Sequence, residues 1–192
     1  MDVPNPWPLA SRSEQTNRQA VTRRGEEDGP LHFCGVLPAQ QPVRIGVVGA
    51  RRARNYQLEL TAELVAGLCA SGATVVSGGA TGVDAAAHRA ALDHQGLTIA
   101  VLPSGLKRPW PARHGDLFQQ IVAQDGAVVS PFDLSAPATR ARFHGRNLLI
   151  CQMIDALIVV CGEVRSGSLH CARRAWRMGL PVLSVPWTPG SP

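Results

Sequence analysis

The sequence contains no long hydrophobic run and no closely spaced pair of cysteines. No apolar segment approaches the ~20 residues that a membrane-spanning helix needs, and residues 1–30 include no apolar core of a signal peptide. We therefore expect a cytoplasmic protein without a membrane partner. The five cysteines are odd in number and lack a Cys-x-x-Cys spacing, which argues against a disulfide framework or a metal centre.

What the sequence does have is an excess of positive charge. The net charge is +5 and the isoelectric point is near 9.4, with arginine supplying nearly all of the cations. A basic balance of this size favours a polyanionic partner such as nucleic acid. A general arginine bias of the genome would give the same composition, so composition alone does not decide between the two.

The length of 192 residues fits one domain with a substantial core. Residues 1–30 are rich in Pro, Arg, Glu and Gln without periodicity, which predicts a flexible arm. Residues 31–192 are predicted to form a single domain, with 31–33 packing against its sheet as a lead-in. Apolar strands alternate with helices from there on. Strands are expected at 43–48, 74–76, 98–102, 127–129, 155–160 and 182–185, and helices at 55–71, 84–94, 116–124, about 146–153 and about 169–178.

Strands that are apolar throughout and alternate with helices are typical of an α/β fold with a mostly parallel sheet and helices on both faces. In such a fold, all loops that follow strands lie along one edge of the sheet. Four polar loops should therefore converge there into one basic, glycine-lined crevice: 49–51, 77–84, 104–107 and 165–168.

The segment after the second predicted strand is the strongest candidate for binding an anion. It brings three glycines into a strand-to-helix turn, where the backbone can approach a ligand closely. The N–H groups and the dipole of the following helix favour a negative charge. We expect Ser77, Gly78, Gly79, Thr81 and Gly82 to hold a phosphate. Turn geometry alone is the competing explanation, and both can be true.

Other candidates lie in the remaining loops. Arg51 is suited to a bidentate phosphate contact. Trp110 lies between Lys107 and Arg113, a composition used for stacking a base while holding its backbone, and a core tryptophan is the alternative. The helix around 146–153 supplies two residues and the late turn supplies four: Arg146, Asn147, Arg165, Ser166, Gly167 and Ser168.

Asp84 and His88 stand four residues apart on one helical face and are interpreted as supporting residues. An acid–base dyad is conceivable there, but a helix cap and a packed histidine fit better, because no nucleophile is apparent. The three arginines of the last helix, Arg173, Arg174 and Arg177, are interpreted as its solvated face.

Several stretches resemble the DprA/Smf family of DNA-processing proteins in the same order along the chain: 47–51, 75–88, 98–102, 105–106, 143–147, 165–169 and 185–186. The resemblance implies a Rossmann-like three-layer sandwich and a non-catalytic protein without a cofactor. It also implies binding of single-stranded DNA, loading of RecA during natural transformation, and a homodimer.

Two other functions remain open from the sequence. Related Rossmann-like domains hold nucleotide derivatives in the same crevice, so a nucleotide sensor is one alternative. A phosphoribohydrolase-type enzyme is the other. Those enzymes resemble Pro-Gly-Gly-x-Gly-Thr-x-x-Glu at the late turn, and the turn at 165–172 lacks the trailing glutamate. Glu163 precedes the turn and is a poor substitute, so the enzyme is the weaker alternative.

Overall fold

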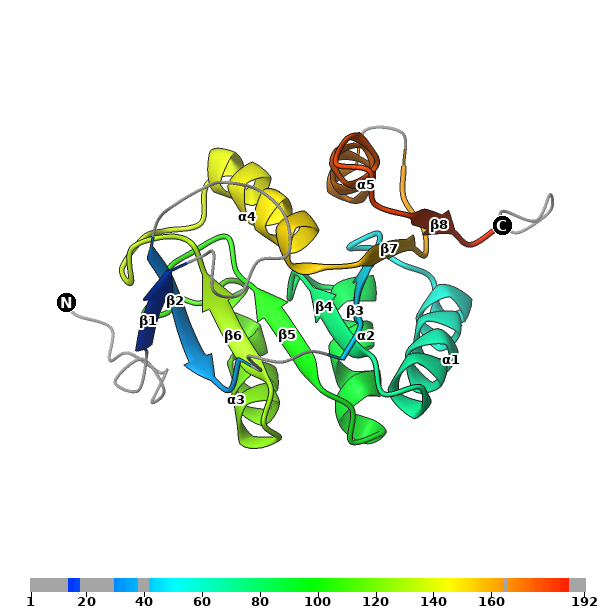
Figure 1. Ribbon diagram of the computed structural model, residues 1–192, viewed down its shortest axis with the longest axis horizontal. Helices are drawn as coiled ribbons and strands as arrows, with labels where there is room; N and C mark the ends of the chain where they lie inside the picture. The colour runs from blue at the N-terminus through cyan, green and yellow to red at the C-terminus, as the bar shows by residue number, and fades with distance from the viewer. Residues whose placement is uncertain (1–13, 18–29, 38–41, 164–165, 187–192) are drawn as a thin grey trace.

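The computed structural model describes residues 14–17, 30–37, 42–163 and 166–186. Within them, eight strands form one sheet in the order β1-β2-β6-β5-β4-β3-β7-β8 (Figure 1). The strands from β6 to β8 in this order are parallel to one another, whereas β2 pairs antiparallel with β6 and β1 antiparallel with β2. The strands are β1 (Glu14–Asn17), β2 (Pro30–Gly35), β3 (Arg44–Val48), β4 (Thr74–Ser77), β5 (Thr98–Val101), β6 (Ala127–Ser130), β7 (Ala156–Val159) and β8 (Val182–Ser184).

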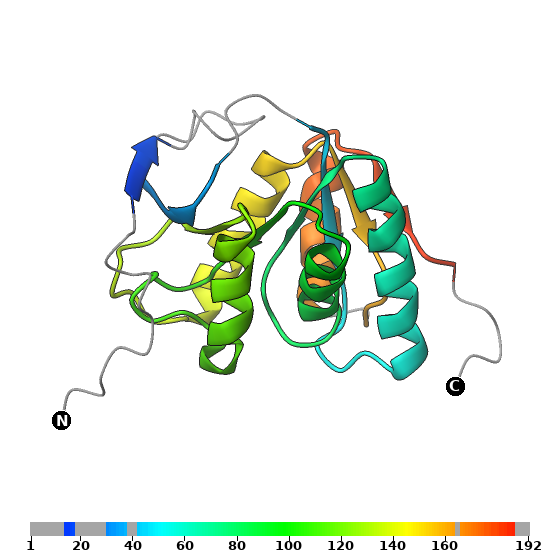
Figure 2. The same cartoon turned by 90° about the horizontal axis from the view of Figure 1, so that it is seen from below.

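Helices cover both faces of this sheet. The first three helices, α1 (Asn55–Ala70), α2 (Val83–Asp93) and α3 (Gly115–Ala123), lie on one face, with the short 3-10 helix η3 (Ala112–His114) ahead of α3. They stand in front of the sheet in Figure 2. The remaining two, α4 (Arg140–Met153) and α5 (Gly167–Arg177), cover the opposite face. The predicted α/β sandwich with a mostly parallel sheet is therefore confirmed.

The central strands are apolar throughout because both of their faces are covered. Every residue of β4, β5 and β6 is buried. Side chains of α4 and α5 pack with one face of the strands into a core cluster that includes Leu149, Ile154 and Leu157. The other face packs on α1, α2 and α3, with Val75, Val83 and Phe118 among the buried side chains. The layers therefore fix the strand ends, and with them the loops that carry the polar residues.

Two parts of the N-terminal region differ from expectation. Residues 30–35 form β2, a full member of the sheet paired with β6, rather than a lead-in segment. Residues 14–17 form β1 on the outer side of β2, although the sequence predicted no strand in the arm. The rest of the predicted arm up to residue 29 lies outside the described residues. β2 pairs with β6, about 100 residues later in the chain, and β1 pairs with β2. Local periodicity in the sequence does not reveal such long-range pairing.

The strand order reverses at β3, and this reversal positions the candidate site. The chain adds β4, β5 and β6 on one side of β3, and then α4 crosses back to place β7 on the other side. Ligands of such sheets bind in the crevice outside the carboxyl ends of the strands at this switch point. Here those ends are Val48 of β3 and Val159 of β7. Among the described residues, no helix has the length and apolar composition needed to cross a bilayer.

Candidate nucleic-acid interface

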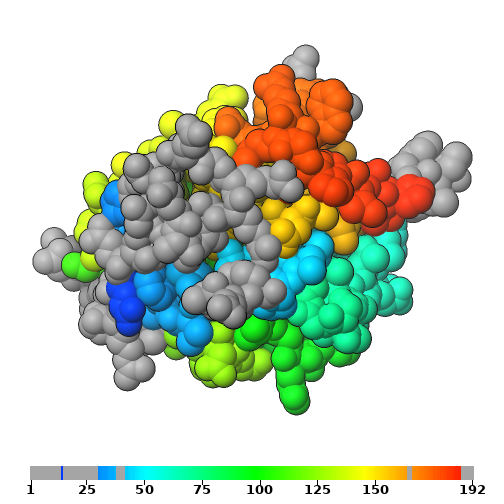
Figure 3. Space-filling model, viewed as in Figure 1, coloured from blue at the N-terminus to red at the C-terminus, as the bar shows by residue number. Residues whose placement is uncertain are grey.

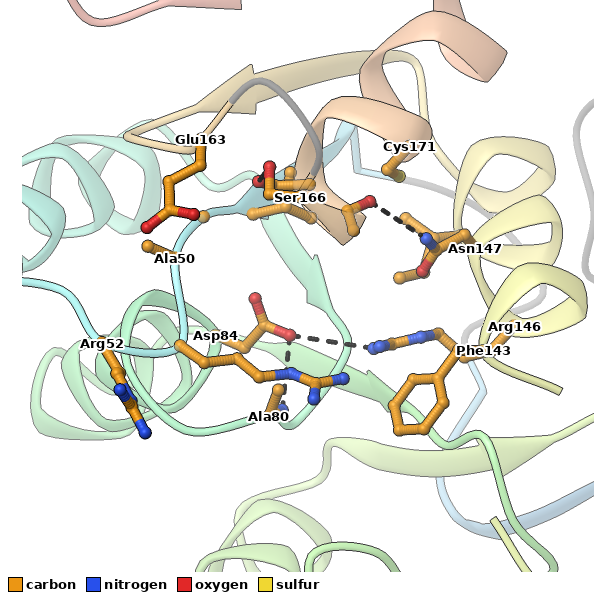
Figure 4. A pocket seen from close by; sticks show the side chains of 16 residues that line it. Ala50, Arg52, Ala80, Asp84, Phe143, Arg146, Asn147, Glu163, Ser166 and Cys171 are labelled. Atoms are coloured by element: carbon orange, nitrogen blue, oxygen red, sulfur yellow. Dashed lines mark hydrogen bonds and ion pairs between the residues drawn. The ribbon is translucent and has the colours of Figure 1, made fainter. Parts of the chain in front are cut away.

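A cavity of about 420 Å³ lies at the switch point (Figure 4). Three of the four predicted loops reach it, together with α4 and the start of α5. The loop after β4 contributes one residue besides Asp84 of α2. The lining residues are Val48, Gly49, Ala50, Arg51, Arg52, Ala80, Asp84, Phe143, Arg146, Asn147, Ile150, Glu163, Ser166, Gly167, Ser168 and Cys171. The predicted convergence of remote loops on one crevice is thus present in the structure.

The start of α5 forms one wall of the cavity. Ser166 caps the helix, and its hydroxyl accepts a hydrogen bond from the Leu169 N–H at 3.3 Å. The hydroxyls of Ser166 and Ser168 lie 2.9 Å apart. Asn147 of α4 donates from Nδ2 to the Gly167 carbonyl at 3.2 Å and so ties the two helices together. The free N–H groups of this first turn and the positive end of the helix dipole make this wall suited to an anion.

The glycine-rich turn after β4 lies mostly beside the cavity rather than on its lining. Ser77, Gly78 and Gly79 are buried and do not line the cavity, and the Ser77 hydroxyl donates to the Val47 carbonyl at 2.6 Å. Within this turn, the Ala80 N–H donates to the Asp84 carboxylate at 3.3 Å. The turn therefore holds an anion, but the anion is a carboxylate of the chain itself.

The remaining residues of the turn also serve its geometry. Gly79 and Gly82 have positive φ angles of 68° and 77°. A Cβ at Gly79 would lie 2.8 Å from the ring of Phe118, and one at Gly82 would collide with the Ala50 carbonyl of the first loop. Thr81 is half-buried and does not line the cavity. The structure thus shows the turn geometry that the sequence left as one explanation for these positions, and phosphate binding by them stays a prediction.

Arg146 pairs with Asp84 beneath the cavity (Figure 4). Its Nη1 lies 3.7 Å from the Asp84 carboxylate and 3.5 Å from the Val101 carbonyl, and only 5% of the residue is exposed. A Cβ at Gly78 would overlap with the guanidinium, so this glycine leaves room for the arginine. Burial raises the pKa of Asp84, and the charge of Arg146 opposes that rise. Burial likewise lowers the pKa of Arg146, opposed by the charge of Asp84.

Arg146 and Asn147 also sit differently in their helix than expected. The sequence placed them at a helix start, but α4 begins six residues before Arg146, at Arg140. Thr139 caps it by accepting a hydrogen bond from the Arg142 N–H at 3.4 Å. Both residues therefore approach the cavity from the middle of α4.

Arg51 stands at the rim beside two aromatic rings. Its guanidinium carbon lies 5.0 Å from the ring centroid of Trp110 and 4.8 Å from that of Phe143. The two rings meet edge to face with their centroids 4.9 Å apart. Both rings therefore make cation–π contacts with an exposed arginine that lines the cavity. Trp110 is half-buried, so it is neither a core tryptophan nor a fully exposed stacking surface.

The other basic residues near Trp110 do not line the cavity. Lys107 and Arg113 are exposed, and the loop of Lys107 packs against the segment after β6, where the Lys107 N–H donates to the Leu134 carbonyl at 2.8 Å. The loop at 104–107 is thus the one predicted loop that the structure does not bring to the cavity. Arg165 of the late turn lies outside the described residues.

His88 is buried away from the cavity and does not contact Asp84. Its Nδ1 lies 2.7 Å from the Thr98 hydroxyl, and that hydroxyl donates to the Val75 carbonyl. Because the hydroxyl hydrogen is used there, Nδ1–H of His88 is the donor. Burial, assisted by the charges of neighbouring basic groups, lowers the pKa of His88 to about 3. The ring is therefore neutral, and the packed histidine is the better description.

Besides the apolar Val48 and Ile150, sequence reasoning missed four residues that line the cavity: Arg52, Phe143, Glu163 and Cys171. Arg52 stands in the same arginine cluster as Arg51, which was an available signal. Phe143 was noted only as part of the family resemblance. Cys171 reaches the cavity because it lies one turn into α5, and its Sγ is 3.7 Å from that of Cys151. The described residues hold no group of three or more His, Cys, Asp or Glu that could bind a metal ion.

Fold and cavity together define a Rossmann-like α/β protein with a helix N-terminus at its switch point. Residues 23–192 match the sequence profile of DNA recombination-mediator protein A. The chain belongs to this family, which includes the proteins called DprA and Smf.

The chain is similar to curated members from distant bacteria. It is 42% identical over 161 residues to a DNA processing protein of Mycobacterium tuberculosis, covering 82% of this chain and 41% of that protein. It is 37% identical over 164 residues to the Escherichia coli protein Smf, covering 85% of this chain and 44% of that protein. The chain therefore spans less than half the length of these two relatives.

Two solved structures of the family share the fold. The DNA processing protein A of Streptococcus pneumoniae superimposes with a TM-score of 0.77 at 31% identity, over 84% of this chain and 56% of that one. The Helicobacter pylori protein superimposes with a TM-score of 0.79 at 26% identity, over 93% of this chain and 83% of that one. The latter structure describes the single-stranded DNA binding mode of that protein.

Proposed function

We propose that this chain binds single-stranded DNA by its phosphate backbone in the switch-point cavity. The observation that carries the proposal is that two arginines, Arg51 and Arg52, and the N-terminal turn of α5 meet at one cavity. They come from segments more than 100 residues apart in the chain. Membership of the DNA recombination-mediator protein A family supports the same ligand.

The first turn of α5 offers the most direct phosphate contact. Gly167 and Ser168 of this turn line the cavity, whereas the Ala80 amide after β4 is already bonded to the Asp84 carboxylate. Arginine at the rim adds bidentate donors, and a guanidinium matches two phosphate oxygens. The cavity also carries Glu163 on its wall, and this carboxylate favours a ligand that enters from the side of Arg51 and Arg52. A phosphate held between the N-terminus of α5 and Arg51 would accept hydrogen bonds from the amides and from the guanidinium.

The rings beside Arg51 supply a surface for the base of the same nucleotide. Trp110 and Phe143 are available for stacking on a base, which works for every base because each has a π face. A strand that places a phosphate at the cavity would bring its neighbouring base towards these rings. This arrangement is sequence-tolerant, as a protein that handles arbitrary DNA requires.

The proposal also describes a binder rather than an enzyme. Asp84 is committed to Arg146, and His88 is committed to Thr98. The family resemblance extends the proposal further: in the cytoplasm, a homodimer would pass the bound strand to RecA. These last steps depend on the whole protein and rest on the family alone.

The test compares a labelled oligothymidylate with thymidine monophosphate, using the natural chain and Arg51→Ala. Affinity for the strand should fall steeply between about 50 and 200 mM salt, because phosphate contacts release counterions. Arg51→Ala should weaken it at least about tenfold, as expected for a lost charge-assisted hydrogen bond, and should lower the salt slope by about 0.7. Fluorescence anisotropy measures both quantities.

Arg89→Ala is the matched control. Arg89 is exposed on α2, on the other face of the sheet, so its removal takes away the same charge without touching the cavity. Absence of strand binding at low salt would refute the proposal. Saturable binding of the mononucleotide with no gain for a longer strand would instead identify a nucleotide sensor, which a cavity of about 420 Å³ could accommodate.

A further inference from the structure

The charged residues of the helices are divided between the two faces of the sheet. Helices α4 and α5 together contain six arginines and two histidines and no acidic residue. Helices α1, α2 and α3 contain five acidic residues and one arginine. The positive charge of the helices is therefore concentrated on the α4–α5 face. Charge separated in this way focuses a polyanion onto one side of a protein.

A second cavity of about 420 Å³ lies on this face, between α4 and α5. One side comes from α5, where His170, Arg173, Arg174 and Arg177 follow one another at helical spacing. The other side comes from His144 and Asn147 of α4. In Figure 3, α5 (orange) lies at the surface beside α4 (yellow). The three arginines are exposed, as the sequence predicted, but they also line a concavity, which the sequence did not predict.

Asn147 belongs to both cavities. It lines the switch-point cavity and the α4–α5 cavity, and its bond to the Gly167 carbonyl fixes it between them. A ligand that occupies the switch-point cavity can therefore continue past Asn147 along α5. The distance from Ser166 to Arg177 is about 16 Å at a rise of about 1.5 Å per residue. That span corresponds to about five phosphates at the spacing of about 3.4 Å found along one strand of duplex DNA, and to fewer in an extended strand.

We propose that the α4–α5 cavity binds the phosphates of single-stranded DNA that extends out of the switch-point cavity. The inference rests on the proposed function and adds to it the path that the strand takes. Arg173, Arg174 and Arg177 neutralise successive phosphates, with Asn147 at the junction. The rings of His144 and His170, whose centroids lie 5.5 Å apart edge to face, offer an aromatic surface to a base.

A single strand fits this site better than the other polyanions that a basic surface attracts. A membrane surface is broad and flat, and binding it takes apolar side chains on the same helix face. The lining of this cavity is instead concave and almost wholly cationic or polar. A single isolated phosphate would not use three arginines spread over more than one helical turn. A flexible chain of phosphates follows such a stripe.

The experiment measures the binding of oligothymidylates of about 3 and about 15 nucleotides, chosen so that the short one fills the switch-point cavity and the long one reaches past α5. The variants are Arg173→Gln, Arg177→Gln and the double variant, and Arg89→Gln is the charge-matched control for each single one. We expect each α5 variant to lower the salt slope for the long strand by about 0.7, and the double variant by about 1.4. Affinity for the short strand should stay within twofold of the natural chain.

Each result bears on the proposal. If the α5 variants bind the long strand as tightly as Arg89→Gln does, the proposed path along α5 is wrong. The proposed switch-point site is then still supported if Arg51→Ala weakens binding. If the α5 variants weaken the short and long strands equally, the two cavities act as one site and the proposed extension is wrong. If the natural chain binds neither strand, the proposed function and the extension both fail. Both α5 substitutions are at exposed positions, and circular dichroism with thermal unfolding verifies that the three variants fold.

Discussion

Replacing Asp84 with Asn should destabilise the fold, because it leaves Arg146 as a buried cation without its counterion. The two charges are 3.7 Å apart, which at an effective dielectric constant of about 20 corresponds to about 4 kcal/mol of attraction. After the substitution, Arg146 keeps a bond of 3.5 Å to the Val101 carbonyl, and its Nε has no partner within the described residues. Breaking a buried pair on one side costs about 3–5 kcal/mol. Urea unfolding at pH 8 would measure this loss.

A double-mutant cycle with Arg146→Met separates the pair from the rest of the site. Met keeps much of the volume against Gly78 and removes the charge. The double variant should therefore be more stable than the sum of the two single losses implies, by about 1–3 kcal/mol. Additive losses would refute the claim that the two side chains form one electrostatic unit.

Although Asp84→Asn should destabilise the fold, it should strengthen the binding of DNA. Asp84 lines the cavity, so removing its charge makes the cavity more positive and should strengthen binding of a phosphate backbone. The salt slope should not fall, because no phosphate contact is lost. Lower stability with higher affinity is the signature expected of a structural carboxylate. Lower affinity at unchanged stability would mean that Asp84 contacts the ligand, and it would refute the role assigned to the turn after β4.

Two further predictions concern other side chains. The pKa of His88 is lowered to about 3, against about 6.5 in an unfolded chain, so the folded state binds fewer protons in this range. Its contribution to stability is complete above pH 6.5 and falls by about 2 kcal/mol at pH 5; urea unfolding of His88→Asn should lack this loss, and an equal pH dependence in both proteins would contradict it. Trp110→Leu should weaken binding of a single strand by about 1–3 kcal/mol with an unchanged salt slope, because it removes stacking and no phosphate contact. A smaller slope in the salt titration would show instead that the change disturbs Arg51.

The sequence predicted the parallel part of the sheet well, because its strands are short apolar runs that end at glycine or at a polar turn. It also predicted the convergence of loops, which follows from the handedness of the crossovers. It missed β2, whose residues mix polar and apolar side chains and become a strand by pairing with β6. The start of α4 was missed too, although Thr139 after Pro137 is a recognisable helix-capping signal.

The roles of individual site residues were harder to predict than the site itself. Ser77, Gly78 and Gly79 have the residue types of a phosphate-binding turn, and the turn does hold an anion. What local sequence does not reveal is that Arg146, more than 60 positions later, packs against Gly78 and pairs with Asp84. Likewise, the spacing of Arg173 and Arg177 shows that they share a helix face, but not that α4 stands opposite them.

The position of Asp84 explains why a bound strand would run towards α5 and not over α2. A phosphate that approached the turn after β4 would meet a carboxylate already bonded to the Ala80 amide, so it would gain no donor and would face a negative charge. At the start of α5, Gly167 and Ser168 line the cavity, and no acidic residue follows along the helix. A phosphate chain that left the switch-point cavity past Asn147 would therefore meet the stripe of Arg173 and Arg177 and no further carboxylate on α5. On the proposed path, the chain fills the first anion site with its own carboxylate, and the strand would use the second.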